Sequence, residues 1–409
     1  MSKIYKKNNW LYIFSILIFI ILEPYTYISM YKVPKFSFLI IASILFFVYI
    51  GKFFANKGDV KISGKKFIVA LTLMGILLLN KLITNDPSYF YFFLVLTICL
   101  AYFISELYNF EKFVEAYSKV MAFLCVFSLI TTYAIIFFPN PFMGIFPTVE
   151  HNPGNYIMKF IDAGLSFVYI PDYGIQYRNY SIFREPGVFQ FYINLALIFE
   201  LWFKNEKIKK SRLVIYYITL ISTFSTTGLI IGLVILFTYI ITNTQSSSNK
   251  IRFIIGISIF LLIFTVLYYK VPFLQENFNG AFDKFNGGES STARTASFVA
   301  YLVAWLNKPI IGWGYTGGVY EAGNLYLHEY TQDNTNTIVT NFAFFGLIYG
   351  LIYQFLMVKF INLSKQTLFI RIVIFSVLML AINSQKFIDS MLIFTLLFYA
   401  IDKRRKIGV

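Results

Sequence analysis

Apolar stretches of roughly membrane-spanning length recur along the whole chain, and they constrain its fold more than any other feature. A bilayer core about 30 Å thick needs about 20 residues of helix for each crossing. Hydrophobic residues make up 58% of the chain and charged residues only 13%, which excludes a soluble globular protein. The sequence therefore predicts an all-α, polytopic integral membrane protein with a single transmembrane domain over residues 1–409. Twelve spans can be placed, at approximate residues 10–30, 36–54, 67–83, 88–105, 113–138, 182–203, 212–222, 228–242, 252–271, 337–358, 367–383 and 386–401.

The stretch 212–242 decides the predicted topology, because it reads either as one long helix or as two short helices broken at 222–228. Basic residues crowd segments that all fall on one side of the membrane only if this stretch crosses twice. By the positive-inside rule that side is the cytoplasm, and both termini are predicted to lie there. Two half-length segments rich in Ser, Thr and Gly are also typical of irregular backbone around a buried polar site, although a tight hairpin without a function is the alternative. The basic segments are Lys3–Lys7, Lys52–Lys66, Lys204–Arg212, Lys250–Arg252, Lys359–Arg371 and Lys403–Lys406.

The formal net charge of +15 follows from this orientation and from anionic lipid at the inner leaflet, and it does not indicate a nucleic-acid partner. Cys99 and Cys125 both fall inside predicted spans, where they are expected to be inert packing residues.

The two histidines, His151 and His328, have no second His or Cys at metal-ligand spacing, so neither a metal site nor another cofactor is expected. Glu23, near the outer end of the first span, is expected to reach the interface by snorkelling.

Two long segments, 139–181 and 271–336, are predicted to lie on the outer, periplasmic face, while the cytoplasmic loops are short. Proline and glycine are expected to break regular structure in the first segment. In the second, residues 290–294 read as a helix start, and Phe298, Tyr301, Leu302 and Trp305 recur at helical spacing, which predicts an amphipathic helix at the membrane surface. Long structured loops often carry function, so an enzyme with an external, membrane-embedded substrate site fits this distribution.

The segment RNYSIFREPGVF, residues 178–189, places two arginines and a carboxylate where the first outer loop enters the membrane. Pro186 suits the first turn of a helix, and Glu185 before it favours the positive end of the helix dipole. Gln190 and Asn194 follow on one helix face, and they are expected to point into the bundle and line a cavity open to the outer side. The competing interpretation is that Arg184 and Glu185 only cap the helix and pair with each other or with lipid headgroups.

Arg178, Arg184 and Arg294 are predicted to lie on the outer side, where a permanently charged, forked group suits phosphate. They indicate a lipid-linked phosphate or pyrophosphate, whose anchor lies in the bilayer. In group transfer from such a lipid, positive charge stabilises the departing pyrophosphate, and a carboxylate or imidazole takes a proton from the attacking hydroxyl. Glu185 is the first candidate for that base and His328 the second.

Other substrate contacts are expected from Gln190, Asn194 and Tyr315. Aromatic residues make up 20% of the chain and would suit stacking on sugars, although most of them are expected to face lipid.

Three segments resemble the O-antigen and capsular polysaccharide polymerase (Wzy) family, within the wider O-antigen ligase and polymerase superfamily. They are RNYSIFREPGVF, the STTG run at 225–228, and the pattern RTASF followed by WLNKPIIGWGY at 294–315. Family sequences commonly have glycine where this chain has Ser181. The twelve-span layout with two large outer loops is similar too, so the resemblance covers nearly the whole chain.

The resemblance implies a GT-C-like, metal-independent glycosyltransferase of the bacterial inner membrane, with an undecaprenyl-pyrophosphate-linked glycan as donor and another as acceptor. It also implies a possible chain-length regulator protein as partner. By the same resemblance, Arg178, Arg184 and Glu185 match the family's R…REPG segment, and Arg294 matches the arginine ahead of the P-x-x-G-x-G-Y segment.

Three other functions stay open at this point. An O-antigen ligase, which transfers the glycan to lipid A core, would share the arginines and suits His328 equally well. A lipid-linked oligosaccharide flippase would also have twelve spans, but no repeat relates the two halves and few charges lie deep in the spans. A peptidoglycan-type polymerase would use an outer-loop aspartate, for which Asp172 is the candidate.

Overall fold

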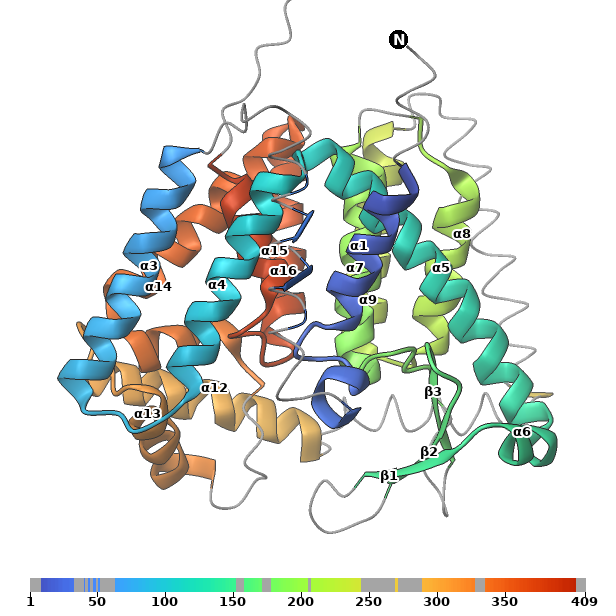
Figure 1. The fold of residues 1–409 in the computed structure, drawn as a ribbon, viewed down its shortest axis with the longest axis horizontal. Helices are drawn as coiled ribbons and strands as arrows, with labels where there is room; N and C mark the ends of the chain where they lie inside the picture. Colours follow the sequence, from blue (N-terminus) through green and yellow to red (C-terminus); the bar gives the residue numbers. More distant parts are fainter. Residues whose placement is uncertain are drawn as a thin grey trace, which may run out of the picture.

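The computed structural model is a bundle of long helices with smaller elements gathered at one end (Figure 1). The predominantly helical class predicted from the sequence is confirmed. The segments predicted as spans at 36–54 and 252–271 lie mostly outside the described residues, as do His328 and Asp172. The structure describes residues 9–32, 40, 43–44, 47–48, 51, 63–151, 158–170, 178–204, 207–243, 269–270, 289–327 and 335–401.

Within these residues, six helices are long and apolar enough to cross a membrane, and two shorter apolar helices accompany them. The six are α3 (Gly64–Thr84), α4 (Phe90–Leu107), α5 (Phe110–Phe137), α7 (Pro186–Ile198) with the π-helical turn η2 (Phe199–Phe203), α9 (Thr226–Asn243), and α14 (Thr337–Ile361) with the turn η4 (Asn362–Ser364). The shorter ones are α1 (Asn9–Ile21) and α15 (Leu368–Asn383). Two further predicted spans are short helices, α8 (Lys210–Ser222) and α16 (Met391–Tyr399).

Helix α7 forms the centre of the bundle. It packs against α5, α8, α9 and α15, and nearly all of its side chains are buried. The predicted start at Pro186 is confirmed, because proline occupies the first turn, where its missing N–H costs no hydrogen bond. A helix that is apolar nearly all round is expected at such a position, since protein surrounds it on every side.

The predicted break in the stretch 212–242 is also confirmed. Helix α8 ends at Ser222 and α9 begins at Thr226, with Phe224 in the left-handed region at φ 46°. The two helices contact each other, and Tyr217 donates a hydrogen bond across to the Gly232 carbonyl at 3.2 Å. The Ser/Thr/Gly run therefore makes a tight connection between two antiparallel helices.

The first outer segment contains more regular structure than its prolines and glycines suggested. After the short helix α6 (Pro139–Ile145), three antiparallel strands follow in the order β1-β2-β3: β1 (Thr148–His151), β2 (Met158–Asp162) and β3 (Phe167–Ile170). One face of the sheet buries Phe160, Phe167 and Tyr169 with Tyr27. The expectation of irregular backbone was wrong here, because alternating aromatic residues build a small core that the local proline content does not reveal.

The second outer segment contains the predicted helix, α12 (Glu289–Asn307), followed by α13 (Tyr315–Ala322) and the π-helical turn η3 (Gly323–Leu327). Helix α12 runs across the direction of the long helices at the end that also carries α13 and the sheet (Figure 1). Its buried face consists of Ser297, Ala300, Tyr301 and Ala304, whereas Phe298 is 42% exposed. Small residues allow α12 to approach α14 closely, so only part of the predicted stripe faces protein.

The glycine-rich turn before α13 packs backbone against backbone on a kink in α14. Gly312, Gly314 and Gly346 all have φ near +80°, which residues with a Cβ rarely adopt. The N–H of Trp313 donates to the Ala343 carbonyl and that of Gly314 to the Phe344 carbonyl, both at 2.9 Å. A Cβ on Gly346 would lie 2.1 Å from the Ile310 carbonyl oxygen, so this close approach requires glycine.

Buried charge is organised around the start of α16 and around α7. Glu23 does not snorkel as expected: it is fully buried, and its carboxylate accepts hydrogen bonds from the Leu392 N–H and the Ser390 hydroxyl. A carboxylate at a helix N-terminus satisfies otherwise unpaired N–H groups and favours the helix dipole. Glu23 thus joins the end of α1 to the last helix.

The end of the bundle away from the sheet and α12, here called the opposite end, holds a closed network of ion pairs. Glu200, which has no exposed side-chain area, lies 3.0 Å from Lys204 Nζ and 3.2 Å from Arg212 Nη1. Glu115 pairs with the same two cations, 3.2 Å from Arg212 Nη2, and with Lys119 at 3.1 Å. These cations, from α5, from the residue after η2 and from α8, are therefore compensated by carboxylates within the chain.

Candidate functional site

The segment 178–185 is fixed at the other end of the bundle, here called the site end, by contacts with the chain that follows α1. Thr26 and Phe183 form an isolated antiparallel bridge, and the Arg184 N–H donates to the Tyr25 carbonyl at 3.1 Å. Asn179 is buried and donates to Ser128 Oγ and Ser222 Oγ, each at 3.1 Å. The backbone between the two arginines of the motif is thus held by three separate elements.

Ser181 lies in the left-handed region at φ 50°. This strained position is the one where the resembling family commonly has glycine, which adopts positive φ at no steric cost.

Glu185 occupies the N-cap position of α7, but its side chain makes no capping hydrogen bond. One carboxylate oxygen lies 3.5 Å from Arg184 Nε, and the other accepts a hydrogen bond from Gln385 Nε2 at 3.2 Å. The Glu185 side chain is 49% exposed, so a reactant can reach it. The Glu185 side chain therefore does not cap the helix, but it does pair with Arg184, as the competing interpretation also expects.

Arg178 is anchored on the turn that separates α8 from α9. Its Nε donates to the Thr223 carbonyl at 2.9 Å and its Nη2 to the Phe224 carbonyl at 3.1 Å. Burial lowers the pKa of the Arg178 guanidinium from its ordinary value, Tyr180 and Glu185 oppose that shift, and the positive charge of Arg294 adds to it.

Arg294, in the first turns of α12, approaches the same place from the second outer segment. Its Nη1 donates to Thr227 Oγ1, at the start of α9, at 3.1 Å. Burial lowers the pKa of the Arg294 guanidinium, and Glu185 raises it. Arg178 and Arg294 therefore meet on the same α8–α9 turn, although they come from two different outer segments.

Arg184 completes the group from the side of α1. Its guanidinium carbon lies 5.3 Å from the centre of the Tyr25 ring, a cation–π distance. Its Nε is buried and makes no hydrogen bond among the described residues. The Tyr25 hydroxyl donates a short hydrogen bond to Asp389 Oδ1.

Three of these partners were missed in the sequence: Tyr25, Gln385 and Asp389. The signal that could have found two of them is the polar run Ser384–Gln385–Lys386 with Asp389, between two strongly apolar stretches. That run forms the turn between α15 and α16, and it reaches the start of α7: a Cβ on Gly187 would lie 2.5 Å from Gln385 Nε2. Tyr25 gave no sequence signal, because aromatic residues at span ends are common.

Gln190 and Asn194 point into the bundle as predicted, but they do not line an open cavity. Both are buried, and Asn194 Nδ2 donates to Gln190 Oε1 at 2.9 Å and to the Gly228 carbonyl at 3.3 Å. Gln190 Nε2 donates to the Gly187 carbonyl at 3.0 Å and to Ser384 Oγ at 3.1 Å. That part of the expectation was wrong, because α9 approaches closely at its glycines and closes the face.

Tyr315 begins α13 and is half-buried. Its ring stacks on Phe90 with centroids 4.1 Å apart, and Lys386 Nζ lies 5.3 Å from its ring centre. Asp86 holds this helix start by accepting from the Thr316 N–H at 2.8 Å and the Thr316 hydroxyl at 2.7 Å. Lys386 links Tyr315 to the same α15–α16 turn that contacts Glu185.

The second candidate base, His328, and the alternative Asp172 lie outside the described residues. Among the residues that the structure describes, no group of three or more His, Cys, Asp or Glu side chains is arranged to hold a metal ion.

Comparisons with protein-family models, with curated proteins and with solved structures find no match to this chain. The chemistry of the site end therefore has to be argued from its own residues. Arg184 lies 3.5 Å from the half-exposed Glu185 carboxylate, and Arg178 and Arg294 meet nearby on the α8–α9 turn. These described residues give the site a surplus of positive charge that suits an anionic ligand.

Proposed function

We propose that the chain is a glycosyltransferase that joins undecaprenyl-pyrophosphate-linked repeat units into an O-antigen or capsular polysaccharide at the outer face of the bacterial inner membrane. The observation that carries this proposal is the convergence of Arg178, Glu185 and Arg294 from three separate elements at one end of a membrane-type helix bundle. A lipid-linked pyrophosphate brings its charge to that depth while its hydrocarbon tail stays in the bilayer.

The arginines would hold the pyrophosphate. Two N–H groups of Arg178 donate to backbone carbonyls, which fixes the plane of its guanidinium. Other N–H groups remain for a ligand. Among the described residues, Arg294 donates one hydrogen bond, to the Thr227 hydroxyl, so other N–H groups also remain for phosphate oxygens. Groups held in this way stabilise the developing charge of the leaving group without having to reorganise.

Glu185 would be the base. In the proposed transfer, the hydroxyl oxygen of the acceptor sugar bonds to the anomeric carbon of the donor, and the bond from that carbon to the pyrophosphate oxygen breaks. The acceptor proton passes to the Glu185 carboxylate, and the electron pair of the broken bond leaves with the lipid pyrophosphate. Gln385 holds one carboxylate oxygen in place, and Arg184 Nε lies 3.5 Å from the other.

The remaining parts of the proposal concern architecture and partners. We propose a GT-C-like arrangement of about twelve spans with both termini in the cytoplasm, a lipid-linked glycan as both donor and acceptor, and a chain-length regulator as protein partner. The charge distribution supports this orientation, because the short connections at the opposite end are rich in lysine and arginine.

Incubating the purified protein with its lipid-pyrophosphate-linked repeat unit, and separating the products by size, tests the proposal. We expect a ladder of multiples from the wild-type protein and only the starting unit from Glu185→Gln. The matched control is Glu150→Gln, which changes another carboxylate of the outer segments whose side chain is 61% exposed, and it is expected to give a normal ladder.

Other outcomes point to the rival functions. Transfer of the glycan to lipid A core without a ladder would identify a ligase, and movement of the lipid-linked sugar across vesicles without chain growth would identify a flippase. A full ladder from folded Glu185→Gln protein would remove Glu185 from the role of base.

A further inference from the structure

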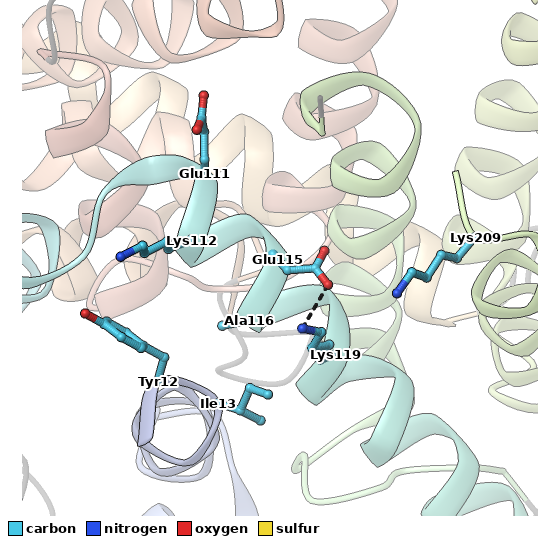
Figure 2. A pocket seen from close by; sticks show the side chains of 8 residues that line it. All are labelled: Tyr12, Ile13, Glu111, Lys112, Glu115, Ala116, Lys119 and Lys209. Carbon is cyan, nitrogen blue, oxygen red and sulfur yellow. Dashed lines mark ion pairs between the residues drawn. The ribbon is translucent and has the colours of Figure 1, made fainter. Parts of the chain in front are cut away.

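A groove at the opposite end of the bundle takes no part in the proposed reaction. It has a volume of about 370 Å³ and lies between α1, the start of α5 and the segment before α8. Figure 2 shows Lys209 pointing from one side toward Glu115 and Lys119 on α5, with Tyr12 and Ile13 of α1 on the other side.

The length of α5 sets the depth of this groove. Its 28 residues correspond to roughly 42 Å of helix at about 1.5 Å per residue, which exceeds a bilayer core about 30 Å thick. All its charged residues lie in the first ten positions, and the stretch from 120 to 137 has none. The apolar stretch fits the hydrocarbon core, so the charged start of α5, and with it the groove, lies at the level of the lipid headgroups.

The aromatic residues of α1 support the same depth. Trp10, at the start of α1, is 79% exposed, and Tyr12 lines the groove two residues later. Aromatic residues with one polar edge gather at membrane interfaces. Lys112 Nζ lies 5.2 Å from the centre of the Tyr12 ring, so a cation and an aromatic face stand side by side at the groove wall.

Among the described residues that line the groove, one cation has no paired carboxylate. Glu115 lines it, but this carboxylate is already paired with Lys119, Lys204 and Arg212. Glu111 and Lys112 also line the groove, and their side chains point in different directions (Figure 2). The Lys209 ammonium group has no ion pair or hydrogen bond among the described residues, although its backbone N–H donates to Glu200. An anion at this position would therefore complete the local charge balance.

We propose that this groove binds the phosphate-bearing headgroup of an anionic phospholipid, with Lys209 on the phosphate, Lys112 beside Tyr12 on the other side of the headgroup, and Tyr12 and Ile13 along the adjoining glycerol and acyl carbons. Basic pockets between membrane helices are suited to such headgroups. The apolar wall favours a lipid over free phosphate, because a soluble anion gains nothing from it. This site is independent of the proposed reaction at the site end.

Lipid binding to the purified full-length protein, counted by native mass spectrometry and followed by thermal unfolding, tests the proposal. Phosphatidylglycerol is compared with phosphatidylcholine of the same acyl chains, and free inorganic phosphate and glycerol phosphate form a third arm. We expect phosphatidylglycerol to bind and to raise the Tm of the wild-type protein more than the other additions. In the variant Lys112→Gln/Lys209→Gln its affinity should fall about 30-fold, since each lysine near an anionic headgroup contributes about fivefold.

The matched control is Lys207→Gln, an exposed lysine of the same segment that does not line the groove; it should bind phosphatidylglycerol as the wild-type protein does. Equal affinity in the wild-type protein and the double variant would overturn the proposal. An equal Tm rise from free phosphate would replace the lipid by a soluble anion and overturn it as well. Should the double variant fail to fold, the single variant Lys209→Gln, which removes no paired group, takes its place in the same measurement.

Discussion

The two ends of the bundle use the same residue types to opposite effect. At the opposite end, Glu200 is fully buried and pairs with Lys204 and Arg212, so positive and negative charges compensate within the chain. At the site end, Arg178 and Arg294 donate to neutral groups, two backbone carbonyls and one hydroxyl, and the nearest carboxylate is half-exposed. Arginine therefore stabilises the fold where its counter-charge is built in, and it is available to a ligand where the counter-charge is missing.

The largest expected effect is on the stability of the compensated end. In Glu200→Ala, Lys204 and Arg212 would stay buried, and Glu115 would be the carboxylate left to pair with both. Removing one partner of a buried ion pair costs about 3–5 kcal/mol, because a desolvated charge remains. We expect a large fall in Tm in detergent, with Glu150→Ala on the exposed sheet as the unaffected control. A Tm equal to that of the wild-type protein would show that the network at this end does not hold the bundle together.

The next effect concerns activity at the uncompensated end. Arg294→Gln removes a charge-bearing donor from the proposed pyrophosphate site, and losing one such donor reduces rates by about 10²–10³-fold. Initial rates of ladder formation measure the loss. The Tm should change little, since among the described residues Arg294 donates one hydrogen bond, to a neutral hydroxyl.

Two further variants sharpen this result. Lys159→Gln, an exposed cation of the outer segments, should leave the rate unchanged. Arg294→Lys keeps the charge but loses the planar guanidinium, which can bind phosphate through two N–H groups. Its rate should therefore lie between those of wild type and Arg294→Gln. If Arg294→Gln lowered the Tm as much as Glu200→Ala, Arg294 would be a structural residue. The proposed difference between the two ends would then be wrong.

An intermediate effect on stability is expected at α7, the helix that connects the two ends. A Cβ on Gly228 would lie 2.6 Å from the Cβ of Gln190, so Gly228→Ala must push α9 away from α7. Overpacking of this kind costs about 1–3 kcal/mol. Gly75→Ala in α3 is the matched control, because a Cβ there meets nothing within 4 Å, and alanine favours helix. Thermal unfolding of both variants decides whether the α7–α9 contact is as tight as described; equal Tm values would contradict it.

Salt is expected to have the smallest effect. It distinguishes the site end from the opposite end without a mutation. Raising the ionic strength from 0.01 M to 1 M shortens the screening length from about 30 Å to about 3 Å. The KM for the lipid-linked substrate should rise, because dissolved ions screen the attraction between its phosphate and the arginines of the site end. Tm should hardly respond, since the ion pairs of Glu200 are shielded from solvent. A KM that does not depend on salt would argue against electrostatic substrate capture.

Several local features could be predicted from the sequence because they depend on neighbouring residues alone. Pro186 starts α7, since its missing N–H costs nothing in a first helical turn. The Ser/Thr/Gly run separates α8 from α9, and the polar start before residue 294 begins α12. The helical class followed from composition and from the length of the apolar stretches, because the backbone can satisfy its hydrogen bonds in lipid only within helices or closed barrels.

The remaining features were decided by the tertiary structure, because they depend on which distant segments meet. The sheet in the first outer segment needs Tyr27, from beyond α1, to complete its core. Gln190 and Asn194 are closed off rather than open to a cavity, since glycines on α9 allow a backbone approach that the spacing within α7 cannot reveal. Gln385 joins Glu185 across 200 positions of sequence separation. The sequence by itself determined the residue types that can carry charge and start helices, and the packing of the bundle determined which of those charges are paired and which are left for a ligand.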